Sequence, residues 1–191
     1  MVEAIKAFRE DYPNIRFDLN FSNTQTNLIE EEIDLTFRLA FDLQDSTYIA
    51  AKLSSTTFGM YASPEYLENR GVPTHFSELE QHDCIHMGSN RYGDVWTLIV
   101  DGKNVTYRQP WTMVVSNTTA LIQALEIGMG IGVIPSIFVR EQINQQQLKE
   151  LSGLTSFPEL GIYGMFPTKK HMPYRMAPVS YTHLTLPTNI G

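Results

Sequence analysis

The stretch NTTALIQALEIGMGIGVIP, residues 117–135, decides the fold class of this chain. Its first half repeats apolar residues at helical spacing, among them Leu121 and Leu125, and Gly128 predicts the end of that helix. The compact apolar run at 131–134 is typical of a short buried strand. The glycines between them favour a tight helix-to-strand turn, because a dinucleotide-binding loop has the opposite order, strand before helix.

Outward from this unit, predicted helices and strands alternate along the chain. Helical spacing and start signals predict helices at 2–10, 24–32, from Pro64 to Gly71, at 73–79, 118–127 and 135–142. Alternating or compact apolar runs predict strands at 15–21, 33–39, 48–53, 58–62, 85–88, 95–100, 105–107, 113–115, 131–134 and 160–167. This order predicts an α/β architecture with largely parallel sheets.

Composition narrows the function classes. The formal net charge is -7, from 14 basic and 21 acidic residues, which argues against DNA binding by these residues alone. The single cysteine, Cys84, excludes an intrachain disulfide and fits a reducing cytoplasm. We expect a cytoplasmic protein, because no signal peptide is visible and no apolar run is long enough to cross a membrane.

The residues that most often carry catalysis form no recognisable arrangement. His82 and His86 have the i,i+4 spacing of a helical zinc site, but the companion carboxylate is missing and residues 85–87 favour a strand. Cys84 has no basic or histidine partner at a known spacing. We therefore expect no enzyme activity, no metal and no cofactor.

Loops that follow predicted strands are the candidate binding residues, because ligands in open α/β sheets bind outside the carboxyl ends of strands. This rule selects residues 38–41, 89–93 and 116–119. Asn117 and Thr118 also open a helix, whose free N–H groups suit an anion. Asn117 has two open interpretations, as part of an anion site or as a plain N-cap.

A series of motifs resembles, in order and spacing, the effector domain of LysR-type transcriptional regulators. These motifs are FREDYP (8–13), IDLTFR (33–38), DSTYIA (45–50), YASPEYL (61–67) with Gly71 and Pro73, HDCI (82–85) after Leu79, Trp96, ALEIGMGIGVIP (124–135) and YGMFP (163–167). Each motif is weak alone, but their order from residue 1 to about residue 176 is specific.

The resemblance implies two Rossmann-like lobes joined by crossover strands, as in type II periplasmic binding proteins. The first lobe would span 1–63, the second 64–161, and residues 162–177 would return to the first. A small effector, for which an organic anion is suited, would bind between the lobes. The expected contact residues are Arg38, Ala40, Phe41, Ser89, Asn117, Thr118, Ile134 and Pro135.

The resemblance also implies parts that this sequence lacks. DNA contact would occur only through an N-terminal winged helix-turn-helix, and self-association through the effector domains is expected. The first strand of the first lobe is also missing, so we expect an exposed sheet position that promotes aggregation. Residues 178–191 contain Pro187 and no helical stripe, and they resemble translated sequencing adapter, which predicts a non-native tail.

A solute-binding protein of a transport system shares this fold and is the alternative. The lack of a signal peptide and, more strongly, the ordered motifs favour the regulator.

Overall fold

The computed structural model describes residues 2–20, 27–41, 48–88, 95–100, 102–108 and 110–166. The predicted contact Ser89 and the predicted tail at 178–191 lie outside these ranges. The helices are α1 (Val2–Asp11), α2 (Pro64–Arg70), α3 (Thr118–Glu126) and α4 (Arg140–Asn144), with 3-10 turns η1 (Phe76–Gln81) and η2 (Ser136–Phe138). The strands are β1 (Thr36–Ala40), β2 (Ile49–Ala62), β3 (Cys84–Met87), β4 (Trp96–Val100), β5 (Lys103–Tyr107), β6 (Met113–Val115), β7 (Ile131–Pro135), β8 (Lys149–Glu150) and β9 (Glu159–Phe166).

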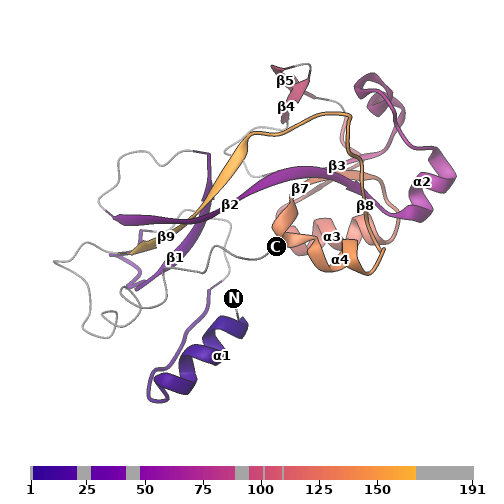
Figure 1. Cartoon of the computed structure of the whole chain (residues 1–191). Coiled ribbons are helices and arrows are strands. Elements are labelled where there is room, and N and C mark those ends of the chain that lie inside the picture. The colour runs from indigo at the N-terminus through magenta and orange to yellow at the C-terminus, as the bar shows by residue number, and fades with distance from the viewer. Residues whose placement is uncertain are drawn as a thin grey trace.

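One long strand, β2, belongs to both halves of the molecule (Figure 1). Residues 49–57 of β2 pair with β9, and β9 pairs in turn with β1. Residues 58–62 of β2 pair instead with β7 and β8. The strand order β1-β9-β2-β7-β3-β6 therefore joins two α/β halves through crossover strands, which confirms the predicted fold class.

The prediction of largely parallel sheets is wrong. Among the described strands, β3 is parallel to β6 and to β7, whereas the other pairings are antiparallel. The reason is that β2 carries the chain out of the first half and β9 carries it back, so these neighbours run in opposite directions. The strands predicted separately at 48–53 and 58–62 are one strand, since the polar residues between them contain no strand breaker.

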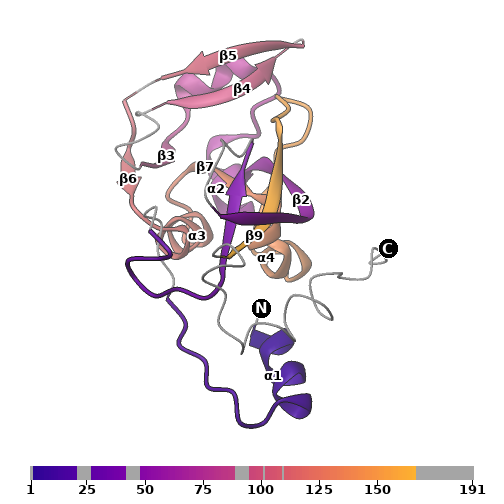
Figure 2. The ribbon, with the colours of Figure 1, turned by 90° about the vertical axis from the view of Figure 1, so that its left-hand side faces the viewer.

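We call the part with β1, β9 and residues 49–57 of β2 the first half, and the part with residues 58–62 of β2 and β3 to β8 the second half. The second half buries both faces of its sheet. Alternate residues of β2 point to opposite faces, so Met60 and Ala62 join one apolar cluster and Tyr61 joins the other. The β4–β5 hairpin covers the first cluster with Trp96, Leu98 and Tyr107. Helix α3 covers the second with Leu121, Ala124 and Leu125. Figure 2 shows the hairpin at the top of this half, at the opposite end of the molecule from α1.

Two helix starts follow their sequence signals. The Ser63 hydroxyl accepts a hydrogen bond from the Tyr66 N–H (3.2 Å), with Pro64 in the first turn of α2. Asn117 caps α3 through its Oδ1 atom. After α3, Gly128 has a φ of +76°, so the predicted tight helix-to-strand turn is confirmed.

Two predictions near the N-terminus are wrong. Residues 15–20 form no strand, because none of the described strands pairs with them, and Phe17 and Leu19 are exposed. Residues 27–32 form turns rather than a helix. Asn27 Oδ1 accepts hydrogen bonds from the Ile29 N–H and the Tyr48 hydroxyl, and these bonds compete with helical ones.

The 3-10 turn η1 replaces the helix predicted at 73–79. At its start, Thr74 donates its N–H to the Glu78 carboxylate (2.7 Å). Within the part of the chain that is described, no helix is long and apolar enough to cross a membrane.

Candidate functional site

The carboxyl ends of three parallel strands meet at one edge of the second half. Met87 at the end of β3 lies opposite Val115 at the end of β6, and the Gly88 N–H donates to the Val115 carbonyl (3.0 Å). Strand β7 runs parallel beside β3 and ends at Pro135. Ligands in such sheets bind at this edge, so it is the structural basis of the candidate site.

The N-terminus of α3 opens at the same edge. Asn117 Oδ1 accepts from the Ala120 N–H at 2.8 Å, so Asn117 is an N-cap. The Thr118 hydroxyl lies 3.7 Å from the sulfur of Met87. The first N–H groups of a helix, here those of Thr118 and Thr119, have no partner within the helix, and such groups suit an anion.

We call the point between Thr57 and Phe58, where β2 changes partner from β9 to β7, the crossover. The end of β1 approaches the crossover from the first half. Ala40 pairs with Gly161 of β9, which pairs with Ser55 of β2. Two strand spacings, about 10 Å, therefore separate Ala40 from the crossover segment. The Phe41 ring lies 6.2 Å from the Phe58 ring, and Phe58 pairs with Pro135.

The expected contact residues thus form two groups in the structure. Phe41 and Pro135 lie around Phe58 at the crossover. Asn117 and Thr118 lie at the β6–α3 junction. Arg38 is half-buried on β1 opposite Tyr163, whereas the Ile134 side chain is fully buried in the cluster under α3.

The sequence did not single out a hydroxyl pair at the crossover. Thr56 Oγ1 lies 3.1 Å from Ser136 Oγ, which links β2 to the turn that follows β7. Thr56 is only 9% exposed. The available signal was the polar run at 54–57 between two apolar strand segments.

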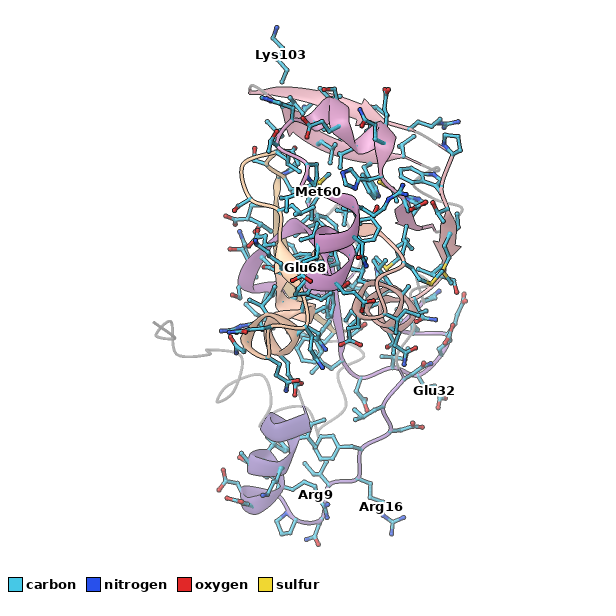
Figure 3. The ribbon with its side chains drawn as sticks, turned by 90° about the vertical axis from the view of Figure 1, so that its right-hand side faces the viewer. Arg9, Arg16, Glu32, Met60, Glu68 and Lys103 are labelled. Carbon is cyan, nitrogen blue, oxygen red and sulfur yellow. The ribbon has the colours of Figure 1, made fainter. Side chains whose placement is uncertain are left out.

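Cavity size does not identify the site. A cavity of about 630 Å³ lies between α1 and the segment after it, where Arg9 and Arg16 line it (Figure 3). A second cavity, of about 230 Å³, lies between β2 and the connection at 150–157. Neither is lined by any of the eight expected contact residues, and we place the site on the strand ends instead.

Shifted ionisable groups lie away from this edge. Burial raises the pKa of Tyr107 to about 12, and burial followed by the Glu150 charge raises the pKa of Tyr61 to about 12. Burial also lowers the pKa of His82, with the Arg70 charge as the second cause. In the described ranges no group of three His, Cys, Asp or Glu residues could hold a metal ion.

Comparison with known proteins finds one family and transcriptional regulators that are similar to this chain. The model of the LysR substrate binding domain matches residues 1–178. The transcriptional regulator PtxR of Pseudomonas aeruginosa is 27% identical over 175 residues, which are 89% of this chain and 54% of PtxR. CrgA of Neisseria meningitidis serogroup C, also a transcriptional regulator, is 31% identical over 141 residues, 74% of this chain and 46% of CrgA.

The solved structures that are similar to this chain are also LysR-type regulators. The regulatory domain of CrgA from Neisseria meningitidis, a LysR-type regulator, has a TM-score of 0.81 at 28% identity, covering 92% of this chain and 85% of that domain. Full-length AphB, a virulence activator of Vibrio cholerae, has a TM-score of 0.77 at 28% identity, covering 92% of this chain and 59% of AphB. The chain spans 61% and 54% of the length of the first two curated relatives it matches.

Proposed function

Because this chain belongs to the LysR substrate binding domain family, we propose that it is the effector-sensing part of a DNA-binding transcriptional regulator. The observation that supports this most is the meeting of strand ends from both halves at the crossover, with Phe58 between Phe41 and Pro135. A ligand there would contact both halves, and it would favour whichever arrangement of the halves it fits better.

The proposed effector is a small organic anion. Its charged group would approach the Thr118 hydroxyl and the N–H groups of Thr118 and Thr119, and Arg38 would add positive charge from the first half. The contact set proposed from the sequence also includes Ala40, Ser89, Asn117, Ile134 and Pro135. Since the Ile134 side chain is in the core, its contribution would come from the main chain.

Control of transcription would follow from this binding through the rest of the protein. We propose that DNA contact occurs only through a separate domain and that effector domains self-associate. The net charge of -7 supports the first part, because phosphate neutralisation needs an excess of basic residues. The family relatives are regulators, so the solute-binding alternative is not favoured.

The test is a thermal-shift screen of small carboxylic acids with the chain and its Thr118→Ala variant. Thr118 lies at the α3 N-terminus, and we expect its replacement to reduce the shift caused by any acid that stabilises the parent chain. The matched control is Thr97→Ala, on the exposed side of β4. If Thr118→Ala responds like the parent to the true effector, the proposed placement of the site is wrong.

A further inference from the structure

The cavity of about 230 Å³ lies where one edge of β2 has no partner strand. On this edge, β9 pairs with β2 as far as Thr57, and β8 pairs with it again from Tyr61. Between these points the connection at 151–158 leaves β2 and returns to it, and β2 and the connection both line the cavity. Figure 1 shows the connection beside β2 on its way from β8 to β9. We call this space the hinge cavity, because β2 and the connection are the two passages of the chain between the halves.

The main-chain groups of Phe58 point toward the hinge cavity. The Leu151 N–H donates to the Met60 carbonyl (2.9 Å), so the main-chain groups of Met60 point to the connection. Along a strand, the N–H and C=O groups of every second residue point to the same edge, and those of Phe58 therefore do so too. The register of β2 with β9, continued by one step, places Pro158 opposite Phe58. Proline has no N–H to donate, and within the described residues Phe58 makes no main-chain hydrogen bond to the connection.

One side of the hinge cavity is apolar. The rings of Phe58 and Phe157 both line it, with centroids 5.9 Å apart and planes tilted by 50°. Both side chains are only partly buried, so they offer ring surface to a ligand. Met60 also lines the cavity, two positions along β2 from Phe58 and on the same face. An aromatic ligand is stabilised by packing against such rings.

This face of the hinge cavity carries no charged side chain among the residues that line it. Glu150 is the one charged residue in the lining, and it pairs with Tyr61 of β2. Paired residues point to the same face, so the Glu150 side chain lies with Tyr61 on the face away from Phe58. Burial, and then the Glu150 charge, raises the pKa of Tyr61 to about 12, which agrees with this placement. An uncharged ligand is therefore favoured over an ion, whose desolvation no opposite charge would offset.

Hydrogen bonding and volume define the ligand further. The N–H and C=O groups of one extended residue lie side by side, so they match a ligand group with a donor next to an acceptor. A primary carboxamide has this arrangement: its oxygen can accept from the Phe58 N–H, and its N–H can donate to the Phe58 carbonyl. A cavity of about 150 Å³ can hold a benzene molecule. A space of about 230 Å³ therefore accommodates one ring with a planar amide group.

We propose that the hinge cavity binds a small aromatic carboxamide, with its ring against Phe157 and its amide group on the main chain of Phe58. This site prefers an uncharged ligand and differs in place from the proposed anion site at α3. A ligand in contact with both passages favours one arrangement of the two halves and so modulates the response to the effector. Binding at the hinge cavity is independent of the identity of that effector.

The test compares three ligands that share a phenyl ring. The dissociation constants of benzamide, acetophenone and benzylamine are measured by calorimetry with the full chain. Acetophenone has nearly the shape of benzamide but lacks the amide donor, and benzylamine is a cation at neutral pH. We expect benzamide to bind roughly tenfold more tightly than acetophenone, because acetophenone leaves the Phe58 carbonyl without a donor, and benzylamine to bind most weakly.

Hydrogen exchange locates the amide group of the ligand. We expect saturating benzamide to slow exchange of the Phe58 N–H roughly tenfold, measured by NMR with isotope-labelled phenylalanine, because that N–H donates to the ligand. The internal control is the N–H of Phe138 in η2, which does not line the cavity and whose exchange should not change. This measurement uses the unsubstituted chain, so it does not depend on the folding of a variant.

A substitution locates the ring of the ligand. Phe157→Leu removes one ring of the cavity, and we expect it to weaken binding of benzamide and of acetophenone roughly fivefold. The matched control is Phe138→Leu, at a ring that is 42% exposed on η2 and does not line the cavity. It should change neither dissociation constant.

Other patterns would contradict the hinge site. Equal binding of benzamide and acetophenone, tighter binding of the amine, or no binding of benzamide would overturn the proposal. Unchanged exchange at Phe58 with benzamide bound would overturn it as well. If Thr118→Ala abolishes benzamide binding while Phe157→Leu does not, the ligand occupies the site at α3 instead. None of these results depends on identifying the effector, so the proposed sensing function is tested separately.

Discussion

At the scale of single residues, Gly130 shows how closely the turn after α3 packs against the start of β3. A Cβ atom at Gly130 would overlap the main-chain carbonyl of Asp83, and that carbonyl is held by a 2.8 Å hydrogen bond from the Ile131 N–H. The main chain cannot yield as a flexible side chain would. This position therefore requires glycine for space as well as for conformation.

We expect Gly130→Ala to lower the free energy of unfolding by roughly 3 kcal/mol, measured by urea denaturation. Gly102→Ala is the control, because Gly102 has a φ of +73° with nothing within 4 Å of an added Cβ. Strain alone should cost that variant roughly 1 kcal/mol. Equal losses in the two variants would show that overlap with Asp83 is not the main cost.

At the scale of elements, the start of α2 depends on one buried hydroxyl. Ser63 is 2% exposed and accepts a hydrogen bond from the Tyr66 N–H, so its loss leaves that donor without a partner. We expect Ser63→Ala to lower the free energy of unfolding by about 1 kcal/mol in urea denaturation. Ser77→Ala, at an exposed position of η1, should leave it nearly unchanged. Similar losses would contradict the capping role.

A polar network ties α2 to the start of β3. The Tyr66 hydroxyl lies 3.2 Å from His82 Nδ1 and accepts from the Asp83 N–H at 2.9 Å. Arg70 contacts the Asp83 carboxylate at 3.5 Å. Burial, and then the Arg70 charge, lowers the pKa of His82 below 6.5, while Glu78 and Asp83 oppose the shift.

This pKa shift predicts a pH dependence of stability. The unfolded chain takes up a proton at His82 at a higher pH than the folded chain does, so stability is lost as the pH falls below 6.5. Between pH 7.5 and pH 5.5, the free energy of unfolding of the parent should therefore fall more than that of His82→Gln. Urea denaturation at a series of pH values measures this. Parallel curves for the two proteins would exclude a contribution from His82.

At the scale of the whole molecule, the first half has an edge strand among the residues that the structure describes. Strand β1 is the terminal strand of the order β1-β9-β2-β7-β3-β6. Phe37 and Leu39, on one face of β1, are 46% and 37% exposed. Edge strands with exposed apolar residues promote association between chains.

We expect Leu39→Lys to reduce concentration-dependent association of the chain, measured by light scattering, because a charge on an edge strand opposes edge-to-edge pairing. The control is Val72→Lys, at an exposed apolar position after α2 that belongs to no strand. If both variants reduce association equally, net charge rather than the β1 edge is responsible.

The sequence by itself determined the parts of this protein that depend on neighbouring residues. The turn at Gly128 and the α3–β7 unit were predicted, and an N-cap was one of the two interpretations of Asn117, because the chemistry of each is contained within a few positions. The ordered motifs also predicted the family, to which the comparisons assign residues 1–178. For the candidate site, local patterns selected the strand ends but not their mutual positions.

Only the tertiary structure decided features that depend on distant partners. The alternation at 15–21 predicted a strand, but a strand requires a hydrogen-bonded neighbour, and none of the described strands pairs with residues 15–20. Strand β2 is continuous because β9 and β7 pair with its two halves in succession. The same pairing places Phe58 next to Phe41 and Pro135, residues far apart in the sequence. The two passages of the chain between the halves, and the cavity between them, follow from that long-range pairing.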